Sequence, residues 1–399
     1  MSKSRKKIVL IANQNEIFFR LRMPWVKLLI KNNFEVFAVT PKGEWTKSIE
    51  SYGAKHIAWE INRSSLNPFG AILSILSLYK ILKTIKPDIT QNFHTKPNIL
   101  APIAGKLAGV KINVSTITGL GYAFVDRNNI NGKFIEYIAT KLYKFANRIS
   151  DKIFFQNLDD FNVLNIKKAI NPKKAIFIEG GSGIDLNDYF PNYKKLNRLS
   201  YESFRKELGI PEKNFVSIFV GRLQYDKGIE EFIEAAKNLK NKNNLSFIVV
   251  GSLDQGNKRS VDELKLKEWE KEKNIIFTGK REDVPKLLSI ADVFVSPSYY
   301  REGVPRTLLE ASATGLPLIG TNMPGIKDVV LNNKNGITID IKNKNDISNA
   351  ILKLSKNKKT CEDFGLKSLE FAKKKYDYKI VVNEYIKFYN SLIVNKNND

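Results

Sequence analysis

The stretch Tyr299-Tyr-Arg-Glu-Gly-Val-Pro-Arg-Thr-Leu-Leu-Glu310 follows an apolar run, Asp292-Val-Phe-Val-Ser296, that is typical of a buried strand. Gly303 allows the backbone to turn tightly after this strand. Pro305 suits the first turn of a helix, because the N–H that it lacks would have no helical partner there. We expect the helix to run from about Arg306 to Thr314 and to end at the glycine that follows. The stretch therefore predicts a strand–turn–helix unit of an α/β sheet.

Two carboxylates flank the start of this predicted helix. Glu302 lies in the loop, and Glu310 lies about one turn into the helix. The backbone N–H groups of Val304, Arg306 and Thr307 lie between them. A helix start favours a phosphate, and a carboxylate can accept both hydroxyls of a ribose or two of a hexose. The pattern predicts a site for a ligand that carries both phosphates and sugar hydroxyls.

A second strand–turn–helix precedes the first in the chain. Phe215-Val-Ser-Ile-Phe-Val-Gly221 has the composition of a buried strand, and Ile229 to Lys240 has the periodicity of an amphipathic helix. Arg222 and Lys227 lie in the turn between them, where open α/β sheets bind ligands. A guanidinium and an ammonium together suit a diphosphate, whereas either cation alone is more often a solvated surface charge. Both turns together predict a nucleotide-sugar site.

Short apolar runs alternate with helical patterns along the whole chain, which predicts an α/β fold with parallel sheets covered on both faces. A chain of 399 residues is expected to hold two domains. We place their join in the Gly-, Pro- and polar-rich segment 180–195, with an N-terminal domain of residues 1–190 and a C-terminal domain of residues 191–377. The predicted strands are Ile8–Ala12, Glu35–Val39, His56–Trp59, Ile89–Asn92, Ile112–Ser115, Ile153–Gln156, Ala175–Ile178, Val216–Val220, Ser246–Val250, Ile275–Thr278, Val293–Ser296, Pro317–Gly320 and Gly336–Ile339.

The second half of the chain resembles the retaining glycosyltransferases of family 4, which have the GT-B fold. The resemblance rests on Gly221-Arg222-Leu with Lys227-Gly228, on Gly279 before a short helix, and on Pro297-Ser with Glu302-Gly303 and Glu310-Ala311. It implies two Rossmann-like domains that face a cleft. It also implies that the last helix, within residues 378–399, crosses back onto the first domain.

The first half is similar to one bacterial branch of that family. Its shared segments are Phe19-Arg-Leu-Arg-Met-Pro24, Asn62-Arg-Ser-Ser-Leu-Asn-Pro68, Gly119-Leu-Gly121, Gly183-Ile-Asp185 and Tyr376-Asp with Tyr385-Ile-Lys-Phe-Tyr389. The branch contains N-acetylgalactosaminyltransferases that act on undecaprenyl-diphosphate-linked sugars. The resemblance implies a UDP-sugar donor and a polyprenyl-diphosphate-linked acceptor, in O-antigen, capsule or glycan biosynthesis.

The resemblance and the turn chemistry together predict a set of site residues. The catalytic candidates are Glu302 and His94, which follows the fourth predicted strand and also has the ordinary alternative of a structural hydrogen-bonding role. The donor-binding candidates are Arg222, Lys227, Arg281, Gly303, Val304, Arg306 and Glu310. The acceptor-binding candidates are Arg20, Arg22, Gly119, Gly121 and Tyr122.

Three departures from the family pattern concern the ligands. Asn13-Gln-Asn15 stands where many members have glycines after the first strand, and Asp328 stands where a Glu is usual. The chain has no Asp-x-Asp, the usual carboxylate pair for a nucleotide-bound metal. Because Arg222, Lys227 and the helix amides could balance the diphosphate charge, we expect no metal and no cofactor besides the sugar nucleotide.

The net charge of +24 has three alternative explanations. An AT-rich genome that favours Lys and Asn codons would explain much of it, and attraction to an anionic membrane is the functional alternative. Nucleic acid is disfavoured, because no basic segment has an aromatic ladder or a zinc spacing. The apolar and basic segment Ile17–Trp25 is the expected lipid contact, through Phe18, Phe19 and Arg20. We expect no apolar stretch of 18 residues, hence a peripheral protein on the cytoplasmic side of the membrane.

The single cysteine, Cys361, excludes an internal disulfide framework and fits a reducing compartment. Three classes of function remain at this level. They are a retaining glycosyltransferase, another nucleotide-sugar enzyme of the same fold such as a 2-epimerase or a phosphorylase, and a non-catalytic basic binding protein. Retention of Arg222, Lys227, Glu302 and Glu310 together disfavours the third class. A UDP-N-acetylhexosamine or its uronamide is the expected donor, GDP-mannose is the alternative, and the oligomeric state is open.

Overall fold

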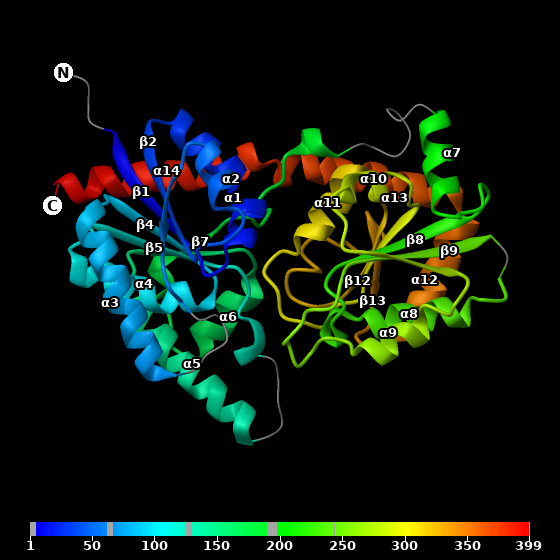
Figure 1. Cartoon of the computed structure of the whole chain (residues 1–399), viewed down its shortest axis with the longest axis horizontal. Coiled ribbons are helices and arrows are strands. Elements are labelled where there is room, and N and C mark those ends of the chain that lie inside the picture. Colours follow the sequence, from blue (N-terminus) through cyan, green and yellow to red (C-terminus); the bar gives the residue numbers. More distant parts are fainter. Residues whose placement is uncertain (1–4, 62–66, 125–129, 190–197, 243, 399) are drawn as a thin grey trace. The chain divides into compact units, whose positions relative to one another are not determined.

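The chain forms two compact units, each built around one parallel sheet (Figure 1). The computed structural model describes residues 5–61, 67–124, 130–189, 198–242 and 244–398. The first unit comprises Met1–Ile184 and Tyr378–Asp399, and the second comprises Asp185–Asp377. The predicted boundary after residue 190 lies outside the described residues, as does most of the shared segment that precedes Pro68. Two Rossmann-like parallel-sheet units of this kind are the GT-B architecture that the sequence predicted.

The first unit contains a seven-stranded sheet in the order β3-β2-β1-β4-β5-β6-β7. Its strands are β1 (Lys6–Ile11), β2 (Phe34–Thr40), β3 (Lys55–Ala58), β4 (Ile89–Phe93), β5 (Ile112–Ile117), β6 (Lys152–Phe155) and β7 (Ala175–Phe177). Its helices are α1 (Asn15–Lys31), α2 (Thr46–Ser51), α3 (Pro68–Ile85), α4 (Thr95–Ala108), α5 (Ile130–Ile149), α6 (Leu158–Ile166) and α14 (Tyr378–Asn398), with short 3₁₀ turns η1 (Gly121–Phe124), η2 (Pro172–Lys174) and, at the start of the second unit, η3 (Leu186–Asp188).

Alternate residues of β1 point to two different apolar cores. Ile8 and Leu10 pack in a core with α1 and α14, whereas Val9 and Ile11 pack in a core with α3 and α4. Further along the sheet, α3, α4, α5 and α6 contribute to one more core with Ile153 of β6. Because side chains alternate along a strand, the two sets of helices cover opposite faces of the sheet.

The sequence pattern predicts a helix over Met23–Lys31, whereas helix α1 begins eight residues earlier, at Asn15. Phe18 and Trp25, which lie seven residues apart on one helical face, are both buried against the sheet. Tertiary packing therefore extends the helix upstream, and Pro24 lies inside it. The stretch Asn13-Gln-Asn15, predicted as a loop, ends in the first helical residue.

The last helix packs on the first unit, as predicted. Val381, Tyr385 and Tyr389 of α14 are fully buried in the core that contains β1 and α1. The N–H of Tyr378 donates to the carbonyl of Ile184 at 2.9 Å. Gly183 has a φ of +68°, and a Cβ there would lie 2.6 Å from the Tyr378 Cα. Only glycine fits this contact, which anchors the start of the returning helix.

The second unit contains a six-stranded sheet in the order β10-β9-β8-β11-β12-β13. Its strands are β8 (Phe215–Val220), β9 (Leu245–Val250), β10 (Ile275–Gly279), β11 (Val293–Ser296), β12 (Leu318–Thr321) and β13 (Gly336–Ile339). Its helices are α7 (Arg198–Glu207), the 3₁₀ turn η4 (Tyr225–Lys227), α8 (Ile229–Asn238), α9 (Glu263–Trp269), α10 (Val284–Ser289), α11 (Arg306–Thr314), α12 (Lys344–Lys356), α13 (Lys358–Phe371) and the π turn η5 (Ala372–Tyr376). Within this unit, α8, α9 and α12 lie on one side of the sheet, and α10, α11 and α13 lie on the other (Figure 1).

Helix α3 corrects one expectation from the sequence. Pro68–Ile85 is an 18-residue helix with a mean hydropathy of 1.4, long and apolar enough by length and composition to cross a membrane. The expectation that no such stretch exists is therefore wrong. Only 22% of this helix is buried inside the protein. Its buried residues Leu78, Leu82 and Ile85 belong to the core beneath the sheet, so the helix is a crossover between β3 and β4.

Candidate active site

The predicted donor motifs meet at the middle of the second sheet. Strands β8 and β11 are neighbours, with Ser217 opposite Val293. From β8 the chain moves outward through β9 and β10, and from β11 it moves to the other side through β12 and β13. The carboxyl ends of β8 and β11 therefore form a topological switch point, where open α/β sheets bind ligands.

Hydrogen bonds join the loop after β8 to the loop after β11. The carbonyl of Asp226 accepts from the N–H groups of Tyr299 and Tyr300, each at 3.0 Å, and from the Ser298 hydroxyl at 3.1 Å. The Lys227 ammonium lies 2.5 Å from Oε1 of Glu302, with both side chains largely buried. Residues that are 75 positions apart in the sequence thus form one ion pair, which holds two predicted site residues together.

Glu310 is buried in the first turns of α11 and has two partners on the same carboxylate oxygen. Arg306 Nε donates to Oε1 at 2.7 Å, and the Tyr189 hydroxyl donates to it at 2.9 Å. Burial and the Glu310 charge raise the pKa of Tyr189, so the phenol stays protonated and donates. Burial lowers the pKa of Arg306, yet the Glu310 carboxylate holds that pKa above its ordinary value. The second oxygen of Glu310 adds acceptor capacity for ligand hydroxyls.

Tyr189 was not predicted from the sequence. It lies just after η3, in the segment read as the join between domains. Its hydroxyl bonds Glu310 of α11, which lies 121 positions later in the chain. No local sequence signal indicates this role, because the burial of Tyr189 follows from tertiary packing.

Three further contacts of arginine side chains lie around these loops. Arg222 is half-exposed, and its Nη1 lies 2.8 Å from Asp254 Oδ2 on the loop after β9. Arg259, which was not predicted, pairs with Asp226 at 2.5 Å and lies over the Tyr300 ring at 4.7 Å from its centroid. The structure therefore places Arg259 beside the predicted cations of the β8 loop.

Arg281 lies farther along the sheet than the other donor-binding candidates. It follows β10, the strand at the sheet's edge, and makes two bonds of 2.7 Å to the Asp283 carboxylate. This bidentate pair closes the turn before α10. The structure does not bring Arg281 into the Lys227–Glu302–Glu310 group.

Gly303 is buried under the turn at Gly325. Gly325 has a φ of +80°, and a Cβ there would lie 1.4 Å from the Gly303 carbonyl oxygen. Only glycine allows this approach, which holds the Glu302–Gly303 loop from the β12 side. Asp328, where the family usually has Glu, accepts from the Gly325 N–H at 2.9 Å. Its shorter side chain serves the turn that supports the loop.

Helix α11 begins directly after the Glu302–Gly303 loop. Its first backbone bond is made by the N–H of Leu308 to the carbonyl of Pro305 at 3.1 Å. The N–H groups of Arg306 and Thr307 precede this bond, as expected for a helix start. Val304 lies in the loop between Glu302 and this helix start. Among the described residues, no group of three or more His, Cys, Asp or Glu side chains could hold a metal ion.

In the first unit, His94 lies at the carboxyl end of β4, next to β1 at the switch point of that sheet. Its φ of 71° and ψ of 162° lie in a region that is essentially restricted to glycine. Such strain occurs mainly at functional sites, because surrounding structure must stabilise it. Lys96, which was not predicted, lies in the first turn of α4, and burial lowers the pKa of its ammonium.

Arg20 and Arg22 have other contacts than those expected of acceptor-binding cations. Arg22 is only 2% exposed, with its Cζ 3.7 Å from the Phe93 ring centroid. Arg20 pairs with Glu16 at 3.0 Å and lies over the Trp45 ring. Arg22 is turned toward the sheet because α1 begins earlier than predicted. An acceptor-binding role for Arg20 and Arg22 stays a prediction.

The same shift changes the expected lipid contact in Ile17–Trp25. Phe18 is buried, and Phe19 stacks on Trp45 with ring centroids 4.5 Å apart. Phe18 is therefore unavailable to a membrane, contrary to the prediction, and Phe19 is partly covered by Trp45. Packing of α1 against the sheet and against α2 explains the difference.

The Gly119–Gly121 loop follows β5, which is the neighbour of β4. Leu120 and Phe124 are buried in the core with α4 and α5, so this loop is anchored at both ends. Gly119 and Gly121 thus follow the carboxyl end of β5, at the same edge of the sheet as His94. Their acceptor-binding role stays a prediction. Tyr122 lies in η1, and nothing is described of its side chain.

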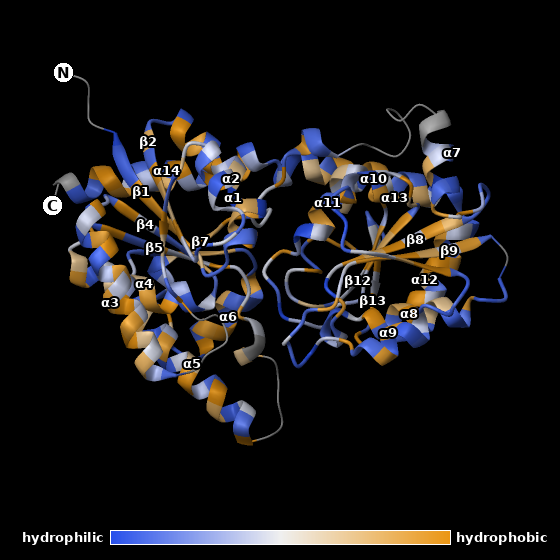
Figure 2. Cartoon of the chain, viewed as in Figure 1, coloured by the Kyte–Doolittle hydropathy of each residue, from blue (hydrophilic) through white to orange (hydrophobic). Residues whose placement is uncertain are grey.

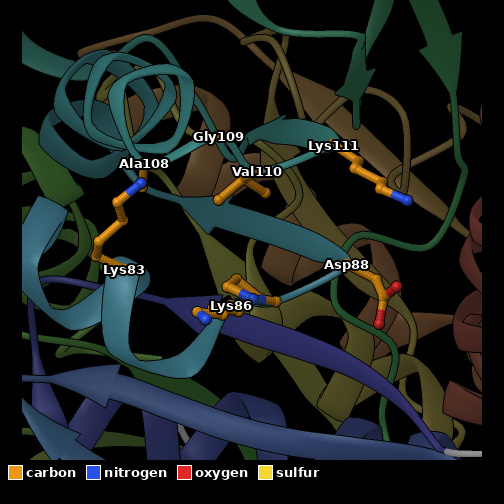
Figure 3. A pocket seen from close by; sticks show the side chains of 8 residues that line it. Lys83, Lys86, Asp88, Ala108, Gly109, Val110 and Lys111 are labelled. Carbon is orange, nitrogen blue, oxygen red and sulfur yellow. The ribbon is translucent and has the colours of Figure 1, made fainter.

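A separate hollow lies at the opposite edge of the first sheet (Figure 3). It is lined by residues at the ends of α3 and α4 and the starts of β4 and β5, including Lys83, Lys86, Asp88 and Lys111. Because ligands of open α/β sheets bind at the carboxyl ends of strands, this hollow is on the wrong edge for the candidate site.

Comparison with known proteins gives matches over both units. Residues 200–370 match the family described as glycosyl transferases group 1, and residues 7–157 match the family described as glycosyl transferase 4-like. The N,N'-diacetylbacillosaminyl-diphospho-undecaprenol alpha-1,3-N-acetylgalactosaminyltransferase of Campylobacter jejuni is 29% identical, over 98% of this chain and 100% of that protein. The UDP-Gal:alpha-D-GlcNAc-diphosphoundecaprenol alpha-1,3-galactosyltransferase of Escherichia coli is 31% identical, over 71% of this chain and 70% of that protein.

Solved structures share the fold. Anabaena Alr3699/HepE in complex with UDP-glucose has a TM-score of 0.77 and 17% identity, covering 96% of this chain and 99% of that one. Sucrose-phosphate synthase from Thermosynechococcus elongatus has a TM-score of 0.80 and 16% identity, covering 98% of this chain and 100% of that one.

Proposed function

This chain belongs to the glycosyltransferases with the GT-B fold, and from that premise we propose that it transfers a sugar from a UDP-sugar to an undecaprenyl-diphosphate-linked sugar. Support comes from the Campylobacter and Escherichia relatives, whose names specify lipid-linked acceptors of this kind. The proposed donor is a UDP-N-acetylhexosamine or a derivative. The proposed setting is O-antigen, capsule or glycan biosynthesis at the inner face of a bacterial plasma membrane.

The observation that carries the donor half of the proposal is the network at the β8–β11 switch point. Lys227 and Arg222, with the start of α11, are suited to a diphosphate because all three offer donors or positive charge. Glu310, held by Arg306 and Tyr189, would accept from the ribose hydroxyls. Glu302 would accept from the transferred hexose after the donor displaces part of its ion pair with Lys227.

The acceptor half of the proposal concerns the first unit. Its candidate residues lie at the carboxyl ends of three neighbouring strands, β1, β4 and β5. His94 is the proposed second catalytic residue, which helps orient the reacting sugar together with Glu302. Its strained backbone supports a functional role. Gly119 and Gly121 would let the acceptor approach the backbone after β5.

We propose that the reaction retains the configuration of the donor sugar. The bond between the anomeric carbon and the diphosphate oxygen breaks, and the acceptor hydroxyl oxygen bonds to the same face of that carbon. The acceptor proton passes to the departing phosphate oxygen. The cationic and amide groups of the second unit would stabilise the charge that develops on that phosphate, without a metal ion.

A donor screen with a synthetic undecaprenyl-diphosphate-sugar acceptor tests this function. UDP-N-acetylhexosamines, their uronamides, UDP-hexoses and GDP-mannose would be compared, with anomeric configuration determined by NMR. We expect one UDP-sugar to give an α-linked product extended by a single residue. Transfer only from GDP-mannose would overturn the UDP assignment. A β-linked product would overturn retention, and interconversion of UDP-sugars without transfer would indicate an epimerase.

A further inference from the structure

The outer side of α3 is an exposed apolar stripe. Phe69, Ile72, Leu73 and Leu76 are spaced at helical intervals, and Phe69 and Leu73 are 75% and 67% exposed. The only charged side chains in the helix are Lys80 and Lys83, both exposed near its C-terminal end. A soluble surface normally breaks up such a stripe, so its persistence indicates a surface that contacts another apolar phase.

This helix is anchored on the protein and does not run freely away from it. The Trp59 indole donates to the carbonyl of Ser74 at 3.0 Å, and Leu78 and Leu82 are fully buried. Its other side therefore belongs to the core under β1 and β2. A helix held in this way can lie on a bilayer with its exposed stripe in the interfacial layer, but it cannot cross the bilayer while the sheet stays folded.

Helix α5 repeats the pattern. Its exposed apolar side chains recur at intervals of three, four or seven residues, and exposed cations lie beside them. The apolar members are Ile130, Phe134, Tyr137, Ile138, Leu142 and Phe145. The cationic members are Lys133, Lys141, Lys144 and Arg148. Such lysines can keep the ammonium at the headgroups while the stem lies along apolar surface.

Helices α3 and α5 cover the same face of the first sheet, since Ala71 and Ile75 of α3 and Ala139 and Tyr143 of α5 contribute to one core around α4. Figure 2 shows orange segments, which mark hydrophobic residues, along both helices. Each helix follows a strand of a parallel sheet, so each begins at the carboxyl edge. The apolar stripes of both helices start at the edge that holds His94 and Gly119.

We propose that the outer faces of α3 and α5 form the docking surface of this protein for an anionic phospholipid bilayer. Apolar side chains would enter the interfacial layer, and the lysines beside them would contact acidic headgroups. A second copy of the chain is the poorer occupant. It would bring the cations of one α5 against those of the other in a protein whose net charge is +24.

The proposal rests on the proposed function in one respect, the need to reach a lipid-linked acceptor. Docking by the starts of α3 and α5 would bring the carboxyl edge of the first sheet close to the headgroups. The diphosphate of such an acceptor lies at that depth, because its polyprenyl chain stays in the bilayer. The surface would thus present the acceptor to the His94 end of the sheet.

Vesicle flotation with the full-length chain tests the surface. Vesicles of phosphatidylglycerol and phosphatidylethanolamine would be compared with phosphatidylcholine vesicles. The test variant is Leu73→Glu with Phe134→Glu, and the control is Leu264→Glu, at a leucine of the second unit that is even more exposed. We expect the wild type and the control to float with anionic vesicles, and the bound fraction of the test variant to fall about tenfold. Circular dichroism would verify that each variant is folded.

A second variant tests the charges alone. Lys133→Gln, Lys141→Gln and Lys144→Gln together leave the apolar stripes intact. We expect this variant to float less with anionic vesicles and to lose the sensitivity of binding to salt that the wild type shows. Unchanged flotation of both variants would overturn the proposal. So would a wild-type dimer, seen by sedimentation velocity, that the Glu variant dissociates without any change in flotation.

An activity assay separates this surface from the function. With a short-chain polyprenyl-diphosphate acceptor in solution, the Leu73→Glu/Phe134→Glu variant should turn over as fast as the wild type. With the undecaprenyl acceptor in anionic vesicles it should be slower. If no lipid-linked acceptor were used but the flotation pattern held, the proposed function would fail and the docking surface would stand. Equal activity of both proteins on vesicles, with equal flotation, would refute the surface and leave the function.

Discussion

The two units differ in how they hold the side chains at the carboxyl edges of their sheets. In the second unit, Lys227, Glu302, Arg306 and Glu310 are held by ionic contacts among themselves. In the first unit, Arg22 is held by aromatic rings, and His94 is held in a strained backbone conformation. Charge that is already organised suits a ligand with a diphosphate, because little reorganisation is needed when it binds. The first unit instead carries exposed apolar side chains along its outer helices α3 and α5.

Removal of Lys227 should have the largest effect on activity, because it disrupts the ionic contacts of the second unit. We expect Lys227→Ala to lower kcat/KM about 30- to 1000-fold, which corresponds to the 2–4 kcal/mol typical of a lost charged contact. Arg222→Ala should cost less, because Arg222 is 42% exposed beside Asp254. Steady-state kinetics would measure both, with Lys240→Ala as the control for an exposed lysine of the same unit. Near-wild-type activity of Lys227→Ala would show that its ion pair is only structural.

Substitutions of Glu310 and Glu302 should affect the binding of different parts of the donor. We expect Glu310→Gln to weaken UDP binding by about 1.5–3 kcal/mol, the range for hydrogen bonds to a charged group. Glu302→Gln should leave UDP affinity unchanged and lower turnover with the UDP-sugar. Calorimetry with UDP alone measures the difference, and Tyr189→Phe reports how much depends on holding Glu310. Equal losses of UDP affinity in the two Gln variants would contradict the division of roles.

Arg22 tests the same comparison in the first unit. Because its guanidinium is buried against Phe93 and Trp25, we expect Arg22→Ala to reduce the free energy of unfolding by about 2 kcal/mol. Arg20→Ala should change it by less than about 0.5 kcal/mol, since Arg20 is partly exposed. Urea denaturation measures both. An Arg22→Ala protein of unchanged stability with a raised acceptor KM would restore Arg22 as a ligand contact.

His94 should show strain that the second unit lacks at its site residues. Glycine adopts the His94 backbone conformation without steric cost, so His94→Gly should be about 1 kcal/mol more stable than His94→Ala, after the entropic cost of glycine. Thermal unfolding of the two variants measures this difference. Both should lose most of their transferase activity if the imidazole orients the reacting sugar. Activity in His94→Ala close to that of the wild type would limit His94 to a structural role.

The smallest expected effect concerns metal ions. Because two cations and the start of α11 can balance the donor diphosphate, activity after EDTA treatment should equal that of the untreated enzyme. Adding magnesium or manganese should restore nothing. Strict dependence on either ion would mean that the cations of the second unit do not suffice for the diphosphate.

Local patterns in the sequence determined much of this protein. The apolar runs predicted the strands of both sheets, and helix α11 begins and ends where Pro305 and Gly315 predict. The turns after β8 and β11 were recognisable because each depends on residues adjacent in the chain. The βαβ alternation also puts the carboxyl ends of the parallel strands at one edge, whereas the pairing of β8 with β11, which makes the two turns neighbours, is seen only in the strand order.

Only the tertiary structure decided which side chains those turns use and which surfaces stay exposed. Tyr189 reaches Glu310, and Arg259 reaches Asp226, across distances in sequence that no local pattern encodes. Arg22 resembles a surface cation until Phe93 and the returning helix α14 bury it. The exposed stripe of α3 has the composition of a core helix. Burial depends on what packs against a residue from elsewhere in the chain, so composition alone does not distinguish a buried face from one that meets a membrane.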